Sequence, residues 1–453
     1  MRRTMNSTRH RLCAIALLVV AIAALPSPAV SAAPESQALA EMQKKLDASL
    51  QMIQALGERV RELEAKQAAT AAAPAVAATA PPVPATTVDN ARLEANEQRL
   101  AQLEKENASR NADDTGLPLH GFADVGAGTR NPINPDLKGF YVGNLDFYMT
   151  PRLGDRTQAL FELNTEVSSE GSVDVDLERA QIGYQFSDQA TVWMGRYHTP
   201  YGYVNTALHH GSWINNSLRR PNFLQFEDNG GIVPAHTVGL WVTGSTRGGA
   251  GKVLYDAYLG NSQAVVDGVL EMRNAGNTDG QLIVGGRVGF QFNAGATEGL
   301  TLGGHAFSAH IANNPVTVNG VPVAAGATRV LSYGAYAVYD TDRWEHIAEI
   351  YLFDNEDLNS GSGRHRSNAG FLQLGYRAPW GVPYARYERA ALSQADPYFA
   401  AQTAGGSYYR VSLGTRFDLD LKSAIKLELA NTRLTDRSRD QYGEGLVQYA
   451  IRF

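Results

Sequence analysis

The sequence has a single cysteine, Cys13, among 453 residues, and it lies before an apolar run that we expect to be removed. The exported chain would therefore contain no disulfide. No later segment approaches the roughly 18 continuous apolar residues that a membrane helix requires. Lysine is also scarce after Leu117, and no basic run with interleaved aromatics suggests a nucleic-acid partner. If the chain enters a membrane, it must do so as a closed β-barrel, because such a barrel satisfies every backbone group in hydrocarbon.

The first 33 residues have the pattern of a secretory signal peptide. Four arginines precede an uninterrupted apolar run from Ala14 to Leu25, and small residues follow at Val30–Ala33. This order of a basic start, an apolar centre and a small-residue cleavage site is typical of export. We expect segment 1–33 to be removed on the way to the periplasm.

Segments 34–67 and 88–110 carry apolar residues at alternating spacings of three and four, which predicts two coiled coils joined by an Ala/Pro/Thr-rich linker at 68–87. Each predicted coiled coil contains a six-residue motif that starts with Arg, ends with Glu and has apolar residues at its second and fifth positions. The two copies run from Arg59 to Glu64 and from Arg99 to Glu104. The pattern resembles the trimerisation motif of short three-stranded coiled coils, which implies a homotrimer. The alternative is a pair of ordinary charged amphipathic helices.

From residue 117 to 453 the sequence consists of short stretches in which apolar and polar residues alternate, which is the pattern of β-strands. In the strand around Ala159–Val167, apolar residues alternate with polar ones that include Glu162 and Glu166, and the same period recurs near 282–292 and 409–417. One apolar face and one charged face predict a barrel with a water-filled lumen, whereas a half-buried strand of a soluble β-sandwich is the competing interpretation.

The connections decide between these interpretations. Seven short turns alternate with eight long loops, which predicts about 16 strands, with 18 as the upper limit. Tight turns at one end and long loops at the other are typical of outer-membrane barrels. The predicted fold class is therefore all-β, a transmembrane antiparallel β-barrel preceded by an α-helical coiled-coil segment. The final strand carries Tyr449, Ile451 and Phe453 at alternating positions, and it resembles the C-terminal assembly signal of Gram-negative outer-membrane barrels.

One connection, residues 198–236, is far longer than its neighbours and contains Tyr201, Tyr203, Trp213, Arg219 and Arg220. So long a stretch without alternation is expected to be functional. The residues Glu178–Tyr184, followed by Gly195-Arg-Tyr-His-Thr-Pro-Tyr-Gly202, resemble the phosphate-selective porin family. That resemblance implies a trimeric porin whose loop folds inward and narrows the barrel. The scarcity of lysine departs from a phosphate-selecting lysine cluster, so phosphate does not follow.

No catalytic or cofactor site is expected. The pair His209-His210 lacks a third ligand at a recognisable spacing, so a solvated or loop-packing pair is favoured over a metal site. The triplet His210-Gly211-Ser212 has the spacing found in the outer-membrane phospholipase, but it lies in a loop rather than on a strand. The paired carboxylates are expected to line the lumen.

The resulting hypothesis is an outer-membrane porin in contact with lipid, a passive diffusion channel for small hydrophilic solutes. The alternative is a structural tether that links the outer membrane to peptidoglycan through the coiled coil. For selectivity, we expect a row of lumen arginines on one arc of the wall to favour anions. An unselective channel, in which these arginines pair with Glu162, Glu166, Glu388 and Asp418, is the competing interpretation. The expected arginines are Arg196, Arg287, Arg377, Arg386, Arg410 and Arg416.

Overall fold

The computed structural model describes residues 119–453, apart from 131–137, 152, 168–171, 209–211, 228, 273–275, 278, 360 and 437–439. The expected signal peptide, both coiled coils with Arg59, Glu64, Arg99 and Glu104, and the linker lie outside the described residues. So does the His209-His210 pair.

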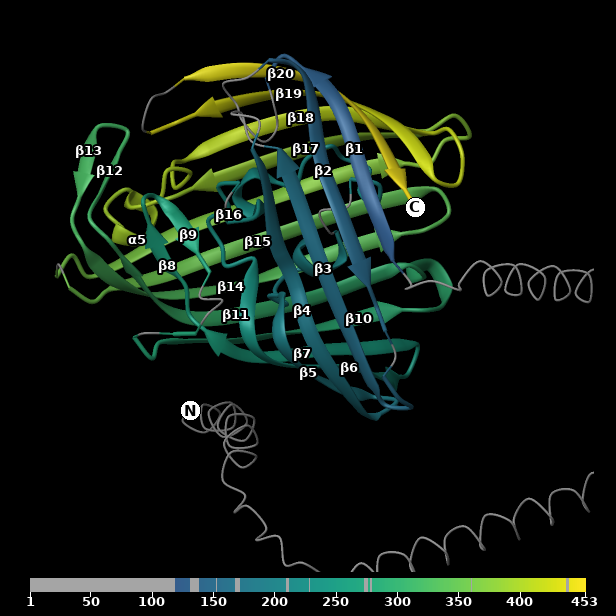
Figure 1. The fold of residues 1–453 in the computed structure, drawn as a ribbon, viewed down its shortest axis with the longest axis horizontal. Helices are drawn as coiled ribbons and strands as arrows, with labels where there is room; N and C mark the ends of the chain where they lie inside the picture. Colours follow the sequence, from purple (N-terminus) through teal and green to yellow (C-terminus); the bar gives the residue numbers. More distant parts are fainter. Residues whose placement is uncertain are drawn as a thin grey trace, which may run out of the picture. The chain divides into compact units, whose positions relative to one another are not determined.

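In the described part of the chain, sixteen antiparallel strands close into a barrel, as the alternation predicts (Figure 1). These strands are β1 (His120–Gly128), β2 (Gly139–Met149), β3 (Thr157–Val167), β4 (Val173–Ser187), β5 (Ala190–His198), β6 (His236–Gly248), β7 (Gly251–Asn261), β10 (Leu282–Phe292), β11 (Leu300–Asn313), β14 (Gly326–Asp340), β15 (Trp344–Asp357), β16 (Arg364–Tyr376), β17 (Val382–Ala391), β18 (Tyr408–Asp418), β19 (Ser423–Leu434) and β20 (Gln441–Arg452).

Side chains alternate between the two faces of each strand because successive residues of a β-strand point to opposite sides. On β18, Arg410 and Ser412 are buried toward the lumen, while Val411 and Leu413 are exposed outside. The outer face is apolar around the barrel, with Met194 on β5 as one of its most exposed side chains at 68%. The predicted division into an apolar exterior and a polar interior is confirmed on β18, whereas the buried face of β10 to β16 also carries apolar side chains such as Phe307 and Phe371.

The last strand closes the barrel by pairing with the first. β20 runs antiparallel to β1, with Phe122 opposite Arg452. Beyond it, the Phe453 backbone N–H donates to the Gly121 carbonyl, and the Gly121 N–H donates to the Phe453 carbonyl, both at 3.1 Å. The Phe453 ring meets Phe147 of β2 edge-on at 5.8 Å. The terminal residue thus continues the ladder and covers the seam.

Long connections gather at the end of the barrel opposite Phe453 (Figure 1). They carry the hairpins β8 (Ala264–Val266) with β9 (Val269–Glu271), and β12 (Val316–Val318) with β13 (Val321–Val323), and the one-turn helix α5 (Pro397–Ala400). The longest connection, 199–235, carries the helix α4 (Val204–Ala207) and the 3₁₀ turn η1 (Asn222–Leu224).

Among the described residues, no helix is long and apolar enough to cross a membrane.

Candidate functional site: the segment across the lumen

The segment 198–236, here called the lumen segment, leaves the wall at the end of β5 and rejoins it at the start of β6. Between these points its backbone is bonded to lumen-facing side chains of distant strands, from β10 to β19. The bonded residues are 85 to 214 positions apart in the sequence, and they lie on the inner face of the wall, so the segment lies inside the barrel rather than over its mouth.

Glu349 of β15 holds the first part of the lumen segment. Its Oε1 accepts hydrogen bonds from the backbone N–H groups of Tyr203 at 2.8 Å and Val204 at 2.7 Å. Its Oε2 accepts from the Tyr351 hydroxyl at 2.6 Å. Gly202 lies directly over this carboxylate with φ of +55°, and a Cβ there would overlap the carboxylate and the Tyr351 hydroxyl. The glycine that ends the Thr-Pro-x-Gly stretch is therefore required by this close approach.

A second anchor holds η1 against β17 and β18. The Asn222 N–H donates to Glu388 Oε2 at 2.7 Å, and the Phe223 N–H donates to the Tyr408 hydroxyl at 3.0 Å. Two of the N–H groups at the start of this turn thus find acceptors on the wall.

Apolar side chains of the lumen segment fill one side of the barrel. Tyr201, Phe223 and Leu224 are fully buried. Phe223 packs edge-on against Tyr351 at 5.4 Å and near Phe371 of β16 at 6.4 Å. The aromatic content of this connection, unusual for a loop in water, is explained by this packing. Since the side formed by β10 to β16 is filled, open space remains on the side formed by β18 to β20 and β1 to β3.

Two of the cavities formed by described residues lie along that open side. The larger, about 800 Å³, is on the long-loop side, and the smaller, about 550 Å³, is on the short-turn side. Ser212 and Asn215 line the first, whereas Trp213 and Ile214 between them line the second. The lumen segment therefore separates the two spaces at residues 212–215.

Two wall residues, Lys426 and Asp124, meet Ser212 of the segment at this point, and Gln448 holds Asp124. The Lys426 ammonium of β19 donates to the Ser212 carbonyl, and Gln448 Nε2 of β20 donates to Asp124 Oδ2 of β1 at 2.9 Å. Sequence reasoning did not single out Asp124, Lys426 or Gln448. Extending the alternation of the first and the last two strands would have placed them on the lumen face, but no local pattern could indicate that the lumen segment meets them.

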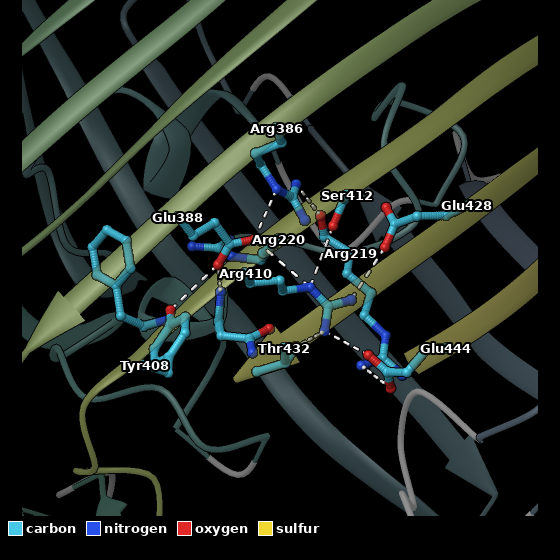
Figure 2. Close-up of polar contacts among 12 residues, drawn as sticks. Arg219, Arg220, Arg386, Glu388, Tyr408, Arg410, Ser412, Glu428, Thr432 and Glu444 are labelled. Carbon is cyan, nitrogen blue, oxygen red and sulfur yellow. Dashed lines mark hydrogen bonds and ion pairs between the residues drawn. The ribbon is translucent and has the colours of Figure 1, made fainter. Parts of the chain in front are cut away.

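Arginines and glutamates of β17 to β20 form one network beside the larger cavity (Figure 2). Arg386 Nε is 2.9 Å from Glu388 Oε1, and the Arg410 guanidinium is 3.3 Å from Glu428 Oε1 and 2.5 Å from Glu444 Oε2. Arg219 of the lumen segment reaches Glu444 Oε1 at 3.2 Å. Three guanidinium groups thus face three carboxylates, and the formal charges of the network cancel.

The other expected arginines are also close to carboxylates. Arg287 Nε is 2.6 Å from Asp256, Arg416 Nε is 2.7 Å from Asp418, and Arg196 is 3.7 Å from Glu178. Of the expected acidic residues, Glu162 Oε2 accepts from Arg179 Nε at 2.5 Å, and Glu166 Oε1 accepts from Asn164 Nδ2 at 3.1 Å.

The expected single arc of arginines is wrong. Arg386, Arg410 and Arg416 lie on neighbouring strands β17 and β18, but Arg196 lies on β5 and Arg287 on β10. The barrel order places these two strands across the wall from β17 and β18, which the local alternation cannot show because it fixes the face of a strand and not its place in the barrel.

Arg377 does not line the lumen wall. It follows β16 in a short turn, where its guanidinium is 2.6 Å from Asp340 and 3.0 Å from Glu345, so it ties neighbouring turns together at the rim.

The two arginines of the lumen segment have different surroundings. Arg219 faces the cavity and Glu444; burial lowers the pKa of its guanidinium, and Glu444 opposes that effect. Arg220 folds back into the segment, where Nε donates to the Leu224 carbonyl at 2.6 Å and Nη2 donates to Asn205 Oδ1 at 2.6 Å. Its guanidinium also lies over the Phe226 ring at 4.1 Å. Arg220 therefore braces the segment from within.

The chain matches no family model and no curated protein sequence. Among solved structures it is similar to the anion-selective porin from Comamonas acidovorans, with 14% identity, a TM-score of 0.48, and coverage of 74% of this chain and 98% of that one. The outer membrane channel DcaP of Acinetobacter baumannii gives 10% identity, a TM-score of 0.44, and coverage of 74% and 96%. Salmonella typhi OmpF gives 12% identity, a TM-score of 0.44, and coverage of 74% of this chain and 97% of that one. All three TM-scores are below 0.5.

Proposed function

We propose that the protein is a general-diffusion porin of a Gram-negative outer membrane that passes small hydrophilic solutes. The observation that carries the proposal is the lumen segment, which is bonded across the interior of an apolar-faced barrel and leaves a cavity of about 800 Å³ beside it. A barrel that served only as an anchor or tether would have no need of this opening, so transport is the function we propose.

The apolar exterior supports a position in lipid, because exposed apolar side chains around the barrel would be unfavourable in water. By the usual asymmetry of such barrels, the short turns and Phe453 face the periplasm and the long connections face outward. The larger cavity is then the external entrance, and solutes pass the segment at residues 212–215 to reach the smaller cavity.

The paired arginines support weak selectivity over a strong preference for anions. Neutralised Arg–Glu pairs orient a solute by a local transverse field but contribute little net potential. The larger cavity is lined by Asp124, Glu166 and Glu227 as well as Arg219 and Arg220, whereas Arg416, Lys422 and Arg452 line the smaller one. Acidic residues predominate in the first cavity and basic residues in the second. A small ion of either sign therefore meets one cavity that attracts it and one that repels it.

We further propose that the channel works as a homotrimer. The Arg/Glu motifs of the expected coiled coils at 34–67 and 88–110 support this assembly. Because β1 begins beside Phe453, at the short-turn end assigned to the periplasm, this tail would start on the periplasmic side, within reach of peptidoglycan.

Liposome swelling with neutral sugars of increasing size tests the transport function. We expect swelling rates that fall steeply with sugar size, because the path is bounded by the lumen segment. Proteoliposomes that contain folded protein, shown by heat-modifiable migration on gels, yet swell no faster than protein-free liposomes would remove the proposal.

A further inference from the structure

We propose that Glu178, His198 and His236 form a binding site for a divalent transition-metal ion, Zn²⁺ being the best match, at the base of the lumen segment. Their candidate ligand atoms all lie within 4.8 Å of one another, and all three side chains are buried. The inference concerns the architecture of the segment and does not depend on which solute the channel passes.

The three residues come from adjacent strands and meet where the lumen segment begins and ends. His198 is the last residue of β5, His236 is the first of β6, and the two are direct partners in the ladder between these strands. Their rings meet edge-on with centroids 4.8 Å apart. Glu178 comes from β4, the other neighbour of β5. The two histidines are held by the β5–β6 ladder, whereas Glu178 lies at a register shift in the pairing of β3 with β4.

Glu227 orients the His236 ring. Its Oε1 accepts from the His236 backbone N–H at 2.9 Å and from Gln263 Nε2 at 2.8 Å, while its Oε2 is 2.9 Å from His236 Nδ1. An ionised carboxylate only accepts hydrogen bonds, so Nδ1 carries the proton. A carboxylate on the outer nitrogen of a histidine is the arrangement that fixes metal-binding imidazoles in proteins.

The opposite nitrogen of the same ring faces Glu178. His236 Nε2 is 3.0 Å from Glu178 Oε2. With a proton on Nδ1, neutral His236 would turn the lone pair of Nε2 toward an oxygen of Glu178 that only accepts hydrogen bonds. Two lone pairs at this distance repel each other, so either a proton or a metal cation must lie between the two atoms. A cation ligated by both atoms fills that requirement. A tetrahedron built from bonds of about 2.0–2.2 Å has edges of about 3.3–3.6 Å, so the two atoms must move apart by a few tenths of an ångström to bind Zn²⁺. A proton on Nε2 is the competing species, and the experiment below separates the two.

The donor set determines the choice of metal. Two imidazoles and one carboxylate suit Zn²⁺, whereas Ca²⁺ and Mg²⁺ prefer oxygen donors. Phe226 stacks on His236 with centroids 5.4 Å apart and lies 6.0 Å from His198, so one side of the site is apolar. Arg196 approaches the same Glu178 oxygen at 3.7 Å and competes with a bound cation. We therefore expect weaker binding than at structural sites with four protein ligands.

Binding of Co²⁺ to the purified, tag-free, chelator-treated trimer tests the site, because Co²⁺ gives visible absorption bands that report its ligands and Zn²⁺ displaces it. We expect one ion per chain, with imidazole ligation. Absence of Co²⁺ bands and of stoichiometric Zn²⁺ uptake in the folded protein would overturn the site and leave a protonated His236 between its two carboxylates.

Matched variants assign the ligands. His198→Gln and His236→Gln should each weaken Zn²⁺ binding by at least tenfold. His305→Gln, which changes a buried histidine of β11 on another part of the lumen wall, should leave it unchanged. Binding that survives both ligand variants but is lost in a His209→Ala, His210→Ala double variant would contradict the proposal. If the histidine variants fail to fold, Glu178→Gln and X-ray absorption of the wild-type zinc complex replace them, and fewer than two imidazole ligands would overturn the assignment.

Discussion

Replacing Glu349 by alanine should release the first part of the lumen segment. Glu349 is only 3% exposed, and its Oε1 accepts the backbone hydrogen bonds of Tyr203 and Val204. A hydrogen bond to a charged group contributes about 1.5–3 kcal/mol, so the loss of two is worth about 3 kcal/mol even at the lower value. Because every 1.4 kcal/mol is about a tenfold change in an equilibrium constant, local opening should increase about a hundredfold.

Amide hydrogen exchange in detergent micelles measures this effect at the two affected amides. Exchange at Tyr203 and Val204 should accelerate about a hundredfold in Glu349→Ala, and by less in Glu349→Gln, whose amide oxygen can still accept. The matched control is Glu356→Ala on the same strand, since Glu356 forms a partly exposed pair with Arg329 at 2.7 Å and such pairs contribute about 0–1 kcal/mol. Equal protection of both amides in wild type and Glu349→Ala would refute the proposed anchoring.

Three further predictions concern charge, pH and assembly. Arg410→Ala should shift the reversal potential in a salt gradient toward cation selectivity, because Glu428 and Glu444 lose their buried partner. Arg433→Ala makes the same charge change at an exposed site and should not shift the reversal potential. Equal shifts in the two variants would contradict the assignment of Arg410 to the lumen. Burial raises the pKa of Asp396, in the connection between β17 and β18, from 3.8 to about 6, so the folded state holds a proton that the unfolded state releases. The stability of this connection should fall as pH rises from about 4 to about 6, and Asp396→Asn should flatten that dependence in hydrogen exchange; an unchanged profile would be evidence against it. Phe453→Ala should lower the yield of heat-modifiable barrel in cells, because the ring covers the β1–β20 seam; an undiminished yield would count against an assembly role.

The sequence was sufficient to predict the barrel because alternation and connection length are local properties. Alternation placed Val411 and Leu413 outside and Arg410 and Ser412 inside, and turn lengths fixed the number of strands. The resemblance to the porin family implied that segment 198–236 folds inward, and the structure has Tyr201 and Phe223 of this segment in the buried core.

The partners of the site could not be predicted in the same way. That Glu349 accepts from Tyr203, or that Lys426 meets Ser212, depends on strand order around the barrel and on where a 37-residue connection crosses it. The grouping of Glu178 with His198 and His236 has the same origin, because the ligands lie on three strands with no common spacing in the sequence. Sequence alternation assigns a face to each side chain, but only the closed sheet determines its neighbours.

Single-channel conductance of a variant that lacks residues 215–226 tests the central claim most directly. This deletion removes η1, Arg219 and the contacts with Glu388 and Tyr408, so the space beside the wall should widen and conductance should rise severalfold. Deletion of the β12–β13 hairpin, residues 316–323, is the control and should leave conductance unchanged. A folded 215–226 deletion with wild-type conductance would contradict the account, because it would mean that the lumen segment does not bound the path.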